Sequence, residues 1–137
     1  MLSLILSAVL WQTPPAPSKS PPATTETAAA EPAAAAADPW GFTVWLNATR
    51  AAHGLHAVGY SADLTAWAAS NNVQQVARGM GHYVMGPARR QDAAWGPYHT
   101  IVMLWMGSPP HRAALLDPTI RWIGIAGSGA YWTFNAE

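Results

Sequence analysis

The chain of 137 residues contains no cysteine. Disulfide bonds and thiolate chemistry are therefore excluded, and the folded part depends on a packed core for its stability. An exported protein of this size without disulfides fits a bacterial cell envelope better than an animal secretory pathway.

Charged residues are also few, since they make up 10% of the chain. The lysines and arginines number 7 and the acids number 7, so the formal net charge is zero. A protein that binds nucleic acid normally presents a concentrated basic patch. We therefore expect no nucleic-acid partner.

The first 39 residues hold little that could form a packed core. Residues 1–11 (MLSLILSAVLW) are apolar but too short for a membrane span of roughly 20 residues, and are typical of a signal peptide core. No basic residue precedes them, so an apolar tail without a role in export is the alternative. Residues 12–39 are rich in proline and alanine, which predicts a disordered linker. Membrane contact is expected only through an uncleaved N-terminal segment.

Residues 40–137 have the composition of one folded domain, because every tryptophan except Trp11 lies there among aliphatic residues. Apolar residues recur at helical spacing in several segments that begin with a capping residue and end at glycine or proline. The expected helices run from Asp38-Pro39-Trp40 to Gly54, from Ser61 to Gly79, over 97–106 and over 112–116.

Two strands are expected after these helices, over 120–125 and 130–134, with Gly127-Ser128-Gly129 as their hairpin turn. Helices first and strands last predict an α+β fold in which helices cover a small antiparallel sheet. Residues 80–98 are rich in glycine and proline, which predicts a long loop of the kind that often binds ligands. Five tryptophans stand at periodic positions and are expected to lie mostly in the core: Trp45, Trp67, Trp105, Trp122 and Trp132.

Two histidines stand in a context that suggests a site. His82 follows Gly81 at the start of the predicted loop, and His111 follows Ser108-Pro109-Pro110 at the entrance of a predicted helix. Two imidazoles in one cleft could share a proton, bind a polar group of a ligand or hold a metal ion. His53, His56 and His99 stand near helix ends; the first two are expected at the surface, whereas His99 remains ambiguous.

Several blocks of this sequence, in this order, resemble the CAP superfamily, or SCP domain, which includes cysteine-rich secretory proteins, antigen 5 and plant pathogenesis-related proteins. The superfamily also includes many bacterial single-domain forms. The resemblance runs from about Phe42 to the C-terminus. It rests on these blocks: Leu46-Asn47-Ala48-Thr49-Arg50 with Gly54-Leu55; Leu64-Thr65-Ala66-Trp67-Ala68; Gly81-His82; Gln91-Asp92-Ala93-Ala94-Trp95-Gly96; Trp105 with Ser108 to Pro118; Ile123-Gly124-Ile125; and Tyr131-Trp132-Thr133.

The resemblance implies an α-β-α sandwich with a central cleft, where the fuller family pattern places two histidines and two glutamates that bind a divalent metal in some members. His82 and His111 match the two histidines. Gln91 and Ser108 stand at the glutamate positions, and Asp92 replaces the asparagine that follows the first glutamate. The implied cleft residues are therefore His82, His111, Gln91, Ser108, Asp92 and Trp95, whose indole could stack on a ligand.

Two histidines supply half of a tetrahedral zinc shell, so no tight metal site or other cofactor is expected. Weak binding of a divalent metal such as zinc by His82 and His111 remains open, with Asp92 as a further oxygen if it turns inward. Ser108 is expected to cap the helix that follows it. No serine stands in a nucleophile-elbow setting, so no catalytic residue is assigned.

Two functions remain open. The first is an exported, non-catalytic module, secreted or held in the cell envelope, whose two-histidine cleft binds a small apolar ligand, a peptide or a glycan. The second is a metal-assisted hydrolase that acts on envelope peptide or polysaccharide. The absence of both glutamates removes a general base and two metal ligands, which favours the first. A domain that meets a partner through its surface alone is a third possibility.

Overall fold

The computed structural model describes residues 38–137, so the predicted signal peptide (1–11) and nearly all of the predicted linker (12–39) lie outside the described residues. These described residues form four helices and four strands, which alternate at first and end with two helices followed by two strands. The helices are α1 (Phe42–Ala52), α2 (Ala62–Arg78), α3 (Tyr98–Gly107) and α4 (Pro109–Leu115). The strands are β1 (Gly59–Tyr60), β2 (Arg90–Trp95), β3 (Trp122–Ser128) and β4 (Tyr131–Ala136).

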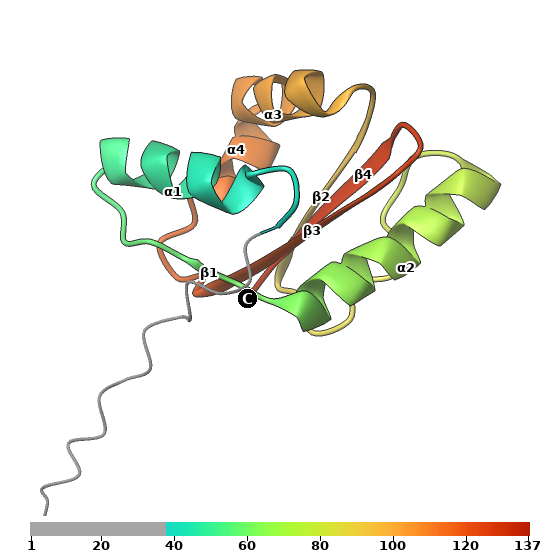
Figure 1. Ribbon diagram of the computed structural model, residues 1–137, viewed down its shortest axis with the longest axis horizontal. Coiled ribbons are helices and arrows are strands. Elements are labelled where there is room, and N and C mark those ends of the chain that lie inside the picture. Colours follow the sequence, from blue (N-terminus) through green and yellow to red (C-terminus); the bar gives the residue numbers. More distant parts are fainter. Residues whose placement is uncertain (1–37) are drawn as a thin grey trace, which may run out of the picture.

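The strands form one sheet in the order β1-β3-β4-β2. Helix α2 covers one face of this sheet, while α1, α3 and α4 lie on the other, which gives three layers (Figure 1). The predicted α+β sandwich is confirmed. The expectation of an antiparallel sheet was incomplete, because β1 pairs with β3 in parallel. A strand of two residues carries too little periodicity to be found in the sequence.

Alternation along the strands gives the two faces different chemistry. Ile123, Ile125, Trp132 and Phe134 point to the side of α1, α3 and α4, where they join Phe42, Leu46, Ile101 and Trp105 in the apolar core. Thr133 and Asn135 point to the other side, where they hydrogen bond with α2 residues or backbone. The core is therefore concentrated in one interface, and the α2 interface is partly polar.

The first two helices begin as their capping signals indicate, with one shift. Helix α1 begins at Phe42 rather than at Asp38–Trp40, yet the Asp38 carboxylate still accepts hydrogen bonds from the backbone N–H of Phe42 and Thr43. Burial raises the pKa of Asp38, but the hydrogen bonds from Thr43, Phe42 and Trp40 outweigh it and lower that pKa. Ser61 caps α2 through Leu64 N–H at 3.2 Å, as predicted.

The prediction of a continuous loop over 80–98 was wrong, because residues 90–95 form β2. The sequence RQDAAW contains no β-branched residue, so its strand conformation is imposed by pairing with β4. The C-terminal strands are displaced from their predicted ranges by a few residues, and the hairpin turns at Gly129, whose φ of 59° suits glycine. Helix α4 starts at Pro109, three residues before the predicted 112, because prolines are tolerated in a first helical turn.

Three of the five tryptophans expected mostly in the core lie there, since Trp105 and Trp132 are buried and Trp45 packs against the core. Trp67 and Trp122 are the exceptions, because they remain 43% and 39% exposed. Trp67 lies on the outward part of α2, where its ring closely approaches Gly86 of the following loop. Helical periodicity predicts α2, but it does not show how much of a ring as large as that of Trp67 extends beyond the apolar face of the helix and stays exposed.

Candidate functional site

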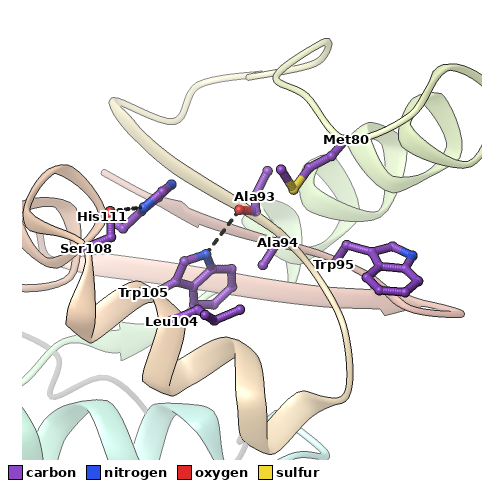
Figure 2. A pocket seen from close by; sticks show the side chains of 8 residues that line it. All are labelled: Met80, Ala93, Ala94, Trp95, Leu104, Trp105, Ser108 and His111. Carbon is purple, nitrogen blue, oxygen red and sulfur yellow. Dashed lines mark hydrogen bonds between the residues drawn. The ribbon is translucent and has the colours of Figure 1, made fainter.

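A pocket of about 430 Å³ lies beside β2, which is an edge strand of the sheet. Figure 2 shows Ser108 and His111 at one end and Trp95 at the other. The lining residues come from the start of the loop after α2, from β2 and its neighbours, and from α3 and α4. They are Met80, Ala93, Ala94, Trp95, Leu104, Trp105, Ser108 and His111.

The wall of this pocket is mostly apolar. Trp105 is buried and fixed from behind, because its indole N–H donates to the Ala93 carbonyl at 3.2 Å. Trp95, Met80 and Leu104 are 62%, 62% and 53% exposed, so they offer large apolar surfaces to whatever enters. Only Ser108 and His111 supply polar side chains to the lining. Apolar walls with a few polar groups are typical of small-molecule sites.

His111 is held by the residue that opens its own helix. Its Nδ1 lies 2.8 Å from the Ser108 hydroxyl oxygen. The prediction that Ser108 caps α4 was half right, because it occupies the N-cap position but its hydroxyl makes no capping bond. Pro109 and Pro110 have no backbone N–H that could donate to this hydroxyl, which hydrogen bonds to the imidazole instead.

Burial, and secondly the charge of His82, lower the pKa of His111 from its ordinary value of 6.5. His111 is therefore mainly a neutral imidazole at pH 7, and its Nε2 can exchange a hydrogen bond with a ligand.

The second histidine is paired with Gln91. The Nδ1 of His82 lies 2.8 Å from Gln91 Oε1, while the Gln91 amide nitrogen donates to the Val84 carbonyl and to Asn135 Oδ1, each at 2.8 Å. Those two bonds use both amide hydrogens, so the Gln91 oxygen must face the imidazole and accept. His82 therefore carries its proton on Nδ1 when neutral, and Nε2 keeps a lone pair.

Asp92 lies next to Gln91 but points to the opposite face of the sheet, as its cross-strand partner Phe134 does. Its side chain is 2% exposed, its Oδ2 has no hydrogen-bond partner, and burial raises its pKa to about 8. Asp92 is not among the residues that line the pocket. It is a buried, largely protonated acid at neutral pH.

The structure thus separates the six candidate residues into three groups. Ser108, His111 and Trp95 line the pocket, whereas His82 and Gln91 form a hydrogen-bonded pair outside its lining and Asp92 is buried away from it. Within residues 38–137, no three His, Asp or Glu side chains gather as a metal-binding group. His53, His56 and His99 are exposed and do not line the pocket.

Sequence reasoning missed five lining residues: Met80, Ala93, Ala94, Leu104 and Trp105. Trp105 was assigned to the core, and it does belong there, since one side of its ring packs inward. The others carry no chemical signature, because an alanine or leucine signals a pocket only through its place in three dimensions.

The comparison with family models matches residues 45–133 to CAP, the cysteine-rich secretory protein family. The chain belongs to the CAP family. It does so without the cysteines that the family name mentions. In this CAP domain the buried Arg50 of the opening motif connects distant segments, because its guanidinium donates to the carbonyls of His56, Leu115 and Asp117.

Two bacterial structures share the fold. An outer surface protein from Borrelia burgdorferi is 16% identical with a TM-score of 0.60, over 70% of this chain and 89% of that one. A cysteine-rich secretory protein from Staphylococcus aureus is 18% identical with a TM-score of 0.59, over 71% of this chain. The CAP domain spans only 37% of that second protein. A comparison with curated protein sequences finds no match.

Among the described residues, no helix of this CAP domain is long and apolar enough to cross a membrane.

Proposed function

We propose that this protein is an exported, non-catalytic binding module whose pocket beside β2 takes a small ligand with an apolar body and one hydrogen-bonding group. The observation that carries the proposal is the composition of the pocket: six apolar or aromatic residues, with Ser108 and His111 together at one end. Export is supported by the secretory family name and by the outer surface protein among the structural relatives.

The pocket favours an apolar ligand over a glycan or a peptide. A sugar chain presents hydroxyl groups on every side, and each hydroxyl that is buried without a partner costs about 1–3 kcal/mol. The lining offers only two polar side chains, and they lie together. A ligand with one polar end, placed at His111, leaves its apolar body against Leu104, Trp105 and Trp95.

His111 and Ser108 form the polar end of this site. If the Ser108 hydroxyl donates to Nδ1, then Nε2 carries the proton and donates to an oxygen of the ligand; in the reverse arrangement, Nε2 accepts from a hydroxyl. Both arrangements use a neutral imidazole, which agrees with the lowered pKa of His111.

The experiment is a titration with the fluorescent apolar probe ANS, followed by competition with 1-decanol and with the soluble glycan cellotetraose. We expect decanol to displace ANS and cellotetraose to leave it bound. Leu104→Asp should weaken ANS binding at least about tenfold, which corresponds to about 1.4 kcal/mol. Met103→Asp is the matched control, since Met103 is a neighbouring, 71% exposed residue of α3 outside the lining. Equal effects of the two variants would contradict the proposed pocket.

The metal-assisted hydrolase is distinguished from the binding module by zinc calorimetry. Micromolar zinc affinity that is lost in His111→Ala would favour the hydrolase, because the ion would then be bound at the pocket. No heat, or heat unchanged by the substitution, would favour the binding module.

A further inference from the structure

The loop after α2 supplies both Met80 to the pocket and His82 to the pair with Gln91. Its large side chains are only partly buried, since Met80 is 62% exposed, and Tyr83 and Met85 are each 38% exposed. Apolar packing therefore fixes its position only in part. Hydrogen bonds to α2 supply the rest.

Asn71, in the middle of α2, is fully buried and makes three hydrogen bonds to this loop. Its Oδ1 accepts from the backbone N–H of Tyr83 at 2.7 Å and of Val84 at 3.0 Å, and its Nδ2 donates to the Gly81 carbonyl at 3.0 Å. These bonds hold the chain on both sides of His82, because they join Asn71 to the residue before His82 and to the two residues after it.

The fourth hydrogen bond of Asn71 fixes the amide to the sheet, because Nδ2 also donates to Thr133 Oγ1 at 3.0 Å. Thr133 in turn donates to Asn72 Oδ1 and accepts from Gln75 Nε2. Both donors and both acceptor positions of Asn71 are thus occupied, which leaves a single orientation for its side chain.

We propose that Asn71 is a positioning residue of the binding site, which holds the loop over 80–84 so that Met80 completes the pocket and His82 stays beside Gln91. The inference deepens the proposed function and rests on it for the role of the pocket. Gln75 assists by accepting from Gly81 N–H at 3.3 Å, at the other end of the same segment.

Asn72 offers a matched control. It is equally buried, lies next to Asn71, and belongs to the same polar layer, but its hydrogen bonds go to Ala126, Gln75 and Thr133 and none goes to the loop. Loss of either amide should reduce global stability. Only loss of the Asn71 amide should release the loop.

The test measures amide hydrogen exchange at Tyr83 and Val84, together with ANS affinity. In the wild-type protein, both amides should be protected; Asn71→Ala should raise their exchange rates at least about tenfold and weaken ANS binding at least about threefold. Asn72→Ala should leave both readouts at wild-type values once each variant is assayed well below its unfolding temperature.

Two results would overturn this role. The first is exchange of Tyr83 and Val84 at unprotected rates in the wild-type protein, a measurement that stands even if Asn71→Ala does not fold. The second is unchanged protection at these amides in Asn71→Ala. A wild-type protein that fails to bind ANS while the two amides respond to Asn71→Ala would instead count against the proposed pocket and not against the positioning of the loop.

Discussion

The imidazole of His82 and the side-chain amide of Gln91 face each other with 2.8 Å between Nδ1 and Oε1. In the fuller family pattern a carboxylate occupies the position of Gln91, and it would favour a charged imidazole. The amide keeps the hydrogen bond without the negative charge. It also adds two donors, which attach the pair to Val84 and Asn135.

This arrangement predicts that Gln91→Glu, although it restores the family residue, destabilises the protein. The new carboxylate oxygen would face the Val84 carbonyl and Asn135 Oδ1, which are both acceptors in the native network. The loss of two donors should lower the free energy of unfolding by about 1–3 kcal/mol, as measured by urea denaturation at pH 7. Gln74→Glu, the same change at a half-buried α2 residue outside these bonds, is the control and should alter stability by less than about 0.5 kcal/mol. A Gln91→Glu protein that is more stable than the wild type would contradict the stabilising role of the two amide hydrogen bonds.

Gly124 of the Ile-Gly-Ile strand predicts a second effect, on packing. A Cβ at this position would lie 2.2 Å from the backbone nitrogen of Thr65 and 2.4 Å from the carbonyl carbon of Leu64, so α2 could accommodate it only by moving away from β3. Gly124→Ala should therefore lower the free energy of unfolding by about 1–3 kcal/mol or more.

Gly107, near the end of α3, is the control for that substitution, because a Cβ there meets nothing within 4 Å. Gly107→Ala should leave the stability unchanged or raise it slightly, since alanine favours a helix over glycine. Thermal unfolding of the two variants would distinguish the effect of close packing from the effect of replacing any glycine. Equal melting temperatures for both would contradict the close approach of α2 to β3.

The glycine also shows why the sequence predicted some features and not others. Ile123-Gly124-Ile125 was recognised as a motif of a strand, but the reason for its glycine lies in α2, far away in the chain. Helix limits were predicted well where local capping decides them, as at Ser61. Strand β2 was missed because its pairing partner, β4, lies about 40 residues later and overrides a weak local propensity.

The candidate site divides in the same way. His82, Gln91, Ser108 and His111 were predicted because their chemistry and their family positions are visible in the sequence. The apolar wall was not predicted, because Met80 and Leu104 meet only through the arrangement of α2 and α3 around the edge of the sheet. Asn71 and Gln75 recur at helical spacing in the sequence, but their hydrogen bonds to the loop depend on where that loop returns.

Asp92 predicts a pH dependence of stability that is unusual for a carboxylic acid. Its pKa in the folded protein is about 8 because of burial, against an ordinary value of 3.8 that applies when the chain is unfolded. Between these two values the folded state holds one proton more than the unfolded state, so the free energy of unfolding decreases as the pH rises. The slope from this group is about 1.4 kcal/mol per pH unit within that window, and the loss is complete above the folded pKa.

Asp92→Asn should remove this contribution, because the amide has a similar shape and no charge. The variant and the wild-type protein should be similarly stable near pH 4, and the variant should become increasingly more stable as the pH approaches 8. Urea denaturation at pH 4, 6 and 8 measures the difference, and Asp63→Asn, at an exposed position in the first turn of α2, is the control for losing one negative charge. Parallel stability profiles for Asp92→Asn and the wild-type protein would mean that Asp92 is already ionised in the folded state, with water or a shift of the surrounding side chains solvating its carboxylate.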